Sequence, residues 1–67
     1  MDVRIHVVFA GESVFLGENL PMPQRGDRIS WEMEGTRIPC GRYRVGDIEW
    51  CINKWSPHKV DLVLESI

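Results

Sequence analysis

Sixty-seven residues are enough for one domain with a small core, because a chain this short buries only about 60% of the surface that it exposes when unfolded. The composition, 43% hydrophobic and 27% charged, is that of a folded globular protein and excludes wholesale disorder. A formal net charge of -2 gives no overall attraction to nucleic acid or to an anionic membrane, so such contacts need a local patch. We therefore expect a single domain over residues 1–67.

The first predicted elements form a hairpin. Residues 3–9 carry an apolar side chain at every second position, which is the pattern of a strand with one buried face. Residues 10–13 have the composition of a turn, and a short strand is predicted at 14–16. Two prolines, two glycines and an asparagine then make residues 17–27 a long loop.

The end of that loop contains Arg25-Gly26-Asp27, the tripeptide of an integrin-binding motif. The same residues are good turn chemistry after Pro23, because proline fixes φ, glycine accepts φ above zero and aspartate bonds nearby amides. An alternating strand follows at once. We therefore interpret the tripeptide as a turn.

Residues 28–34 alternate again, with Trp31 in the middle of the apolar face. A turn at 34–36 precedes a short return strand predicted at residues 37–38. Pro39 interrupts that strand because proline has no amide donor.

Residues 42–53 form the longest predicted strand. Its apolar phase changes at Gly46-Asp47, since Val45 and Ile48 are three residues apart rather than two. A bulge or sharp bend there would restore one apolar face. After a loop, residues 60–64 alternate once more and form the final predicted strand.

The whole chain lacks the three-and-four apolar spacing of a helix. Five or six short antiparallel strands joined by turns avoid exposed edges by curling into a barrel. We therefore expect an all-β fold, a small antiparallel barrel of SH3-like type, with an OB-like barrel as the alternative.

Metal and catalytic chemistry find little support. Ten residues separate Cys40 from Cys51, far from the C-x₂-C spacing of a zinc site, so we expect free thiols, with a disulfide as the alternative. His6 lies on the polar side of the first strand, and the serines and carboxylates show no catalytic context. We expect no metal, no cofactor and no enzymatic activity.

The segment from 41 to 59 gathers aromatic and basic side chains, and residues 37–59 hold five Lys/Arg against two acidic residues, a local +3. Aromatic side chains beside cations are typical of single-stranded nucleic-acid binding. They are equally typical of a strand whose aromatic side chains face the core. The alternation places Trp31, Tyr43 and Trp50 in the core, whereas Trp55 lies in a loop and is predicted to be exposed. The candidate binding residues are Arg42, Arg44, Lys54, Trp55 and Lys59.

A resemblance rests on four stretches: Pro23 to Ile29, Gly41 to Val45, Ile48 to Trp50 and Val60 to Leu64. Over roughly residues 21–65 the chain resembles small uncharacterised bacterial and phage-associated β-barrel proteins of SH3-like type. The resemblance implies the fold but supplies no catalytic residues. The acidic aromatic opening of a signalling SH3 domain is missing, so binding of proline-rich ligands is not implied.

These patterns predict a protein-protein interaction or assembly module that docks a protein partner or a second copy through its edge strands and the Trp55 loop. A module that binds single-stranded nucleic acid or RNA is the alternative. The opening residues lack the long apolar run of a secretory signal or a membrane span, so we expect a cytoplasmic location and no membrane partner.

Overall fold

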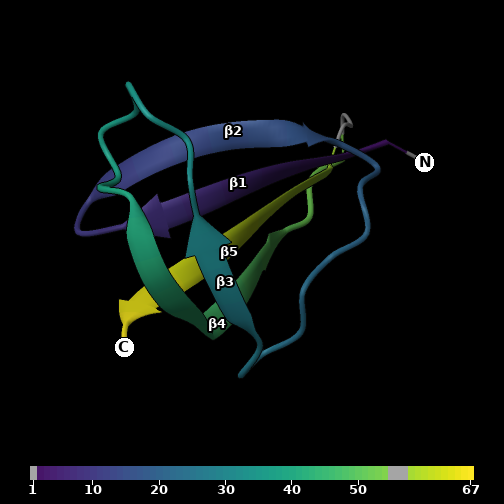
Figure 1. The fold of residues 1–67 in the computed structure, drawn as a ribbon. Helices are drawn as coiled ribbons and strands as arrows, with labels where there is room; N and C mark the ends of the chain where they lie inside the picture. Colours follow the sequence, from purple (N-terminus) through teal and green to yellow (C-terminus); the bar gives the residue numbers. More distant parts are fainter. Residues whose placement is uncertain (1, 55–57) are drawn as a thin grey trace.

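A computed structural model of the chain describes residues 2–54 and 58–67, which contain five strands and no helix. The strands are β1 (Val3–Phe9), β2 (Glu12–Glu18), β3 (Arg28–Trp31), β4 (Gly41–Cys51) and β5 (His58–Ser66). They form one sheet in the order β2-β1-β5-β4-β3, which curls into a half-barrel with β2 and β3 as its edges (Figure 1). The predicted all-β fold is confirmed, in a form consistent with a small SH3-like or OB-like barrel.

The strand pairing differs from the prediction in one respect. Three of the four pairings are antiparallel, but β1 and β5 pair in parallel, with Ile5 opposite Val60 and Val7 opposite Leu62. The expected purely antiparallel sheet is therefore wrong. Alternation identifies a strand and its buried face, but it does not identify the neighbour or its direction.

The hairpin between β1 and β2 is tighter than predicted. Its loop contains only Ala10 and Gly11, whose φ angles are 50° and 80°. β2 extends over seven residues rather than the predicted three. The added residues include polar ones at both ends of the strand, which suit an edge strand.

The connection between β3 and β4 contains no strand, so the return strand predicted at residues 37–38 is wrong. The Trp31 indole N–H donates a hydrogen bond to Thr36 Oγ1 over 3.2 Å. Thr36 Oγ1 lies 3.1 Å from the carbonyl oxygens of both Met33 and Ile38, and its single proton serves one of them at a time. This side chain ties the connection together without a strand ladder, and Ile38 is buried under it.

The bulge predicted in β4 is confirmed. The register against β5 shifts between Val45 and Asp47, so that Val45 lies opposite Leu64 and Ile48 opposite Leu62. The extra residue restores the apolar phase, since both β5 partners are buried.

The core fills the concave face of the sheet. Among the described residues, the buried side chains of this core are Ile5, Val7, Trp31, Ile38, Tyr43, Val45, Val60, Leu62 and Leu64. The burial of Trp31 and Tyr43 was predicted correctly, and the Tyr43 ring packs edge-on against Phe9 with centroids 4.8 Å apart.

The predicted burial of Trp50 is wrong, because its side chain is 49% exposed. Trp50 lies opposite Val60, on the same face as the core, so its phase was correct. β3, however, pairs only with residues 41–44 of β4 and does not extend over Trp50. Phase determines which face a side chain takes, whereas burial also needs another segment to cover it.

Candidate functional site

The turn at Arg25-Gly26-Asp27 sets the position of β3 against β4. The Asp27 amide donates to the Gln24 carbonyl over 3.0 Å, and Gly26, the third residue of this turn, has a φ of 91°. Gly26 N–H donates to the Val45 carbonyl and Val45 N–H donates to the Asp27 carbonyl, so two residues of this segment oppose Val45. This is a bulge that begins with a left-handed glycine, and the interpretation of the tripeptide as a turn is confirmed.

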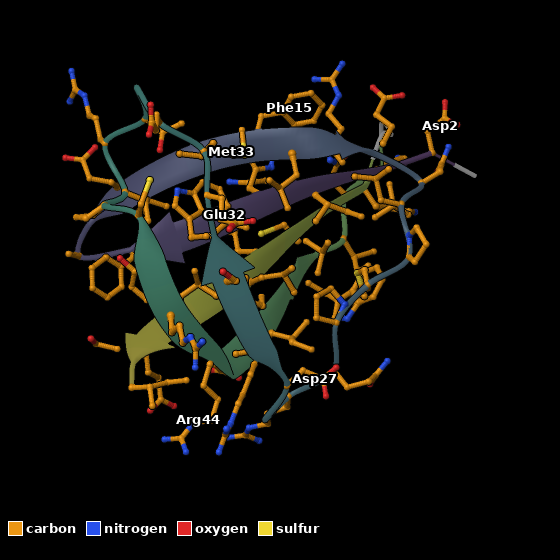
Figure 2. All side chains as sticks on the ribbon, in the orientation of Figure 1. Asp2, Phe15, Asp27, Glu32, Met33 and Arg44 are labelled. Atoms are coloured by element: carbon orange, nitrogen blue, oxygen red, sulfur yellow. The ribbon has the colours of Figure 1, made fainter. Side chains whose placement is uncertain are left out.

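Three arginines gather on the convex face beyond this turn. Arg28 on β3 lies directly opposite Arg44 on β4, and Arg42 lies two residues from Arg44, opposite Ser30. Residues two apart on a strand share a face, so all three side chains project from the same side of the sheet. We call Arg28, Arg42 and Arg44 the arginine face; Figure 2 shows Arg44 pointing away from the sheet.

The register places two of these arginines, Arg28 and Arg44, directly opposite each other. Val45 and Asp27 are joined by a hydrogen bond, and ladder pairs alternate in an antiparallel sheet, so Arg28 and Arg44 form a non-hydrogen-bonded pair. Side chains approach each other most closely in such pairs, and like charges there repel. Glu65 on β5 offsets part of this repulsion, because its Oε2 accepts a hydrogen bond from Arg44 Nη2 over 3.2 Å.

An open pocket of about 310 Å³ lies in the same region. Arg28, Ser30 and Arg42 supply its guanidinium and hydroxyl donors, and Ile29 and Ile67 supply apolar surface. Guanidinium groups bind carboxylates and phosphates through two parallel hydrogen bonds, so these donors suit an anionic group attached to an apolar body.

The structure brings together only part of the predicted binding set. Arg42 and Arg44 lie on the arginine face, but Lys59 lies at the other end of the convex face, where its Nζ is 3.5 Å from Asp61 Oδ1. Lys59 and Glu65 are six residues apart on β5, which corresponds to roughly 20 Å along a strand. Lys54 is exposed just after β4, and Trp55 lies outside the described residues, so its exposure stays a prediction.

Sequence reasoning missed Arg28. Alternation with Ile29 predicts that Arg28 lies on the polar side of its strand, but Arg28 lies outside the 41–59 segment and is absent from the predicted binding set. The sequence does show that Arg28 and Ser30 lie on the same face of a strand, because they are two residues apart. Only the register of β3 against β4 places Arg28 beside Arg42 and Arg44.

The two edges of the sheet also expose backbone and apolar side chains. Within residues 2–54 and 58–67, β2 and β3 each have one strand neighbour. Phe15 on β2 is 50% exposed and points outward in Figure 2. Ile52, which follows the last residue of β4, is 69% exposed.

A second group of polar side chains crosses the convex face near β1. His6 lies opposite Asp61 on β5 and Phe15 on β2, and the His6 and Phe15 rings are 5.2 Å apart. Burial lowers the pKa of His6 below its usual value, and the charges of Lys59 and Arg4 act in the same direction, whereas Asp61 opposes them. His6 is half-buried on the predicted polar side of β1.

Cys40 and Cys51 are free thiols. Among the residues that the structure describes, no group of three His, Cys, Asp or Glu side chains has an arrangement that would hold a metal ion. The same part of the chain has no helix with the length and hydropathy needed to cross a membrane.

Comparison with known proteins yields no relative: no family model, no curated protein and no solved structure matches this chain.

Proposed function

We propose that this protein is a non-catalytic interaction or assembly module that docks a protein partner along an open edge of its sheet. The observation that carries this proposal is the pairing order, which leaves β2 and β3 without a second neighbour in the described part of the chain. Edge strands present unpaired backbone N–H and C=O groups, and many small domains bind an extended segment there as an extra strand. Free thiols at Cys40 and Cys51 support a reducing, cytoplasmic setting for this role.

Site-specific photocrosslinking in cells tests the proposal. A benzophenone amino acid replaces Ser13 on β2 or Ser30 on β3, and the matched control replaces the exposed Glu34, which lies in a turn. We expect one or a few discrete protein adducts from an edge position and none from Glu34. The absence of adducts from both edges, or equal adducts from all three positions, would count against an edge-docking module.

Single-stranded nucleic-acid binding is the second candidate, and the arginine face is the observation that favours it. Phosphates are good ligands for closely spaced guanidinium groups. Against it, the predicted basic residues divide between two ends of the convex face, with Arg42 and Arg44 at one end and Lys59 at the other. A labelled oligonucleotide titrated at increasing salt tests this candidate, because phosphate contacts release counterions and weaken steeply with salt.

A further inference from the structure

The free edge of β3 presents a definite pattern of backbone groups. Asp27 is hydrogen-bonded to Val45, and paired residues alternate along the ladder, so Ile29 and Trp31 direct their backbone groups toward β4. The N–H and C=O groups of Arg28 and Ser30 therefore point away from β4, toward the open side of the sheet. These are the groups that an added strand would bond.

The side chains of the same two residues lie on the arginine face. An incoming antiparallel strand would place the residues opposite Arg28 and Ser30 on this convex face, within reach of Arg42 and the pocket. On the incoming strand, the residue between these two positions would point to the other face of the sheet, beside the partly buried Ile29. The fitting segment is therefore acidic at every second position and apolar between.

We propose that the edge of β3 binds an extended acidic segment of a partner protein as an additional antiparallel strand, with its carboxylates on the arginine face. This inference rests on the proposed function and specifies its partner chemistry. Charge complementarity selects the acidic segment, since the only acidic side chain hydrogen-bonded to the three arginines in the described residues is Glu65. A nucleic acid fits less well, because stacking needs exposed aromatic rings near the phosphate contacts, and Phe15 lies on the opposite edge strand while Trp50 lies on the other face of the sheet.

The test uses a capped, fluorescent decapeptide of alternating glutamate and valine, with the full chain as its receptor. We expect saturable binding that weakens with salt. A peptide of the same composition with its glutamates grouped at one end should bind at least about tenfold more weakly, because a glutamate pair opposite Arg28 and Ser30 then directs a third carboxylate toward the partly buried Ile29. A peptide with lysine in place of glutamate should not bind.

Backbone methylation separates strand addition from simple charge attraction. In the proposed register the glutamate amides point toward β3 and the valine amides point away. N-methylation of the glutamates should abolish binding, whereas N-methylation of the valines should leave it within about twofold. In the bound state the amide protons of Arg28 and Ser30 should become protected from exchange, with little change at Ile29.

Variants of the receptor locate the site. Arg28→Gln and Arg42→Gln should each weaken binding by about tenfold, the usual effect of losing one charge-assisted hydrogen bond. Arg37→Gln is the matched control: Arg37 is equally cationic, but it is paired with Glu12 and is 83% exposed away from the arginine face. Melting temperatures of all three variants show whether the fold is retained.

Four results would overturn the proposal: equal binding of the grouped peptide, indifference to glutamate methylation, equal loss with Arg37→Gln, or tighter binding of an oligothymidylate than of the decapeptide. Self-association that blocks the β3 edge would also overturn it, in favour of a second copy as occupant. Crosslinking from Ser13 on β2 in the cellular experiment would still support an interaction module. Failure of the acidic-segment proposal therefore does not by itself contradict the proposed function.

Discussion

At the scale of single residues, the backbone of Ala10 is the clearest local conflict in the chain. Ala10 and Gly11 form a two-residue hairpin loop with φ above zero at both positions. Such a loop matches the twist of the two strands, but the left-handed region costs most residues about 1–2 kcal/mol, so it favours glycine, which has no Cβ, or asparagine, whose short side chain hydrogen-bonds locally. The chain tolerates this cost at Ala10 because the hairpin register requires the conformation.

Ala10→Asn should therefore stabilise the protein by about 1 kcal/mol, which corresponds to a rise of roughly 4–8 °C in melting temperature for a domain of this size. Thermal unfolding followed by circular dichroism measures the change. Gly11→Ala is the complementary control, and it should destabilise the protein by a similar amount because Gly11 has a φ of 80°. An unchanged melting temperature for Ala10→Asn would show that the hairpin does not hold Ala10 in strain.

His6 links protonation to stability through its surroundings on the convex face. Burial lowers its pKa in the folded protein, so the unfolded chain binds the proton more readily. Stability linked to His6 is then full above the usual pKa of about 6.5, falls as the pH drops below that value, and levels off below the lowered pKa.

The matched variant is His6→Gln, which retains a polar side chain but does not titrate. Urea unfolding at pH 7.5 and at pH 5.5 should show a smaller loss of stability for the variant than for the wild type. A loss of the same size in both proteins would assign the acid sensitivity to other groups.

At the scale of elements, the two glycine-containing irregularities around β4 determine how the sheet curls. Gly26 begins the bulge in the segment that leads into β3, and Gly46 is the extra residue in β4 itself. Gly26 lies across the ladder from Val45, and Gly46 follows Val45 in the chain. A bulge bends its strand and increases the local twist, so this pair turns β3 and the first half of β4 over the core.

Gly46 has a second constraint, because a Cβ at this position would collide with the side chain of Glu65. Gly46→Ala should destabilise the protein by about 1–2 kcal/mol, because the half-exposed Glu65 side chain must turn away and give up its hydrogen bond to Arg44. In Glu65→Ala the collision is absent, so adding Gly46→Ala to that variant should cost less than about 1 kcal/mol. Urea unfolding of the four proteins gives this coupling, and additive effects would contradict the steric explanation.

At the scale of the whole molecule, the core is small and asymmetric. β1 and β5 bury apolar side chains under the curl of β3 and β4, whereas no strand in the described part of the chain covers Trp50 on the second half of β4. A domain of this size has a stability of only a few kcal/mol, so the contributions of single large side chains decide whether it folds.

The tryptophans test this asymmetry. Trp31 is 4% exposed, so Trp31→Ala should cost about 3–5 kcal/mol and leave most of the protein unfolded. Trp50→Ala should cost less than half as much and retain the dispersed amide spectrum of a folded protein, because half of its side chain already contacts solvent. Equal losses in the two variants would show that another segment covers Trp50 in solution.

Much of this fold was predictable because its causes are local. Alternation located four of the five strands, a turn signal located the hairpin that contains the fifth, the three-residue step from Val45 to Ile48 located the bulge, and proline-glycine chemistry located the turn at Gly26. Each of these signals depends on neighbouring residues and on backbone geometry alone. Two of the five predicted site residues, Arg42 and Arg44, also share a face for this local reason.

Tertiary structure alone decided the parallel pairing of β1 with β5, the exposure of Trp50 and the place of Arg28 beside Arg44. All three depend on which strands become neighbours and where each strand ends. The sequence by itself determined where the chain is extended, which side of each strand is apolar and where it turns. Strand neighbours are chosen by burial summed over the whole core, and residues far apart in the chain contribute to that sum, so no local pattern contains it.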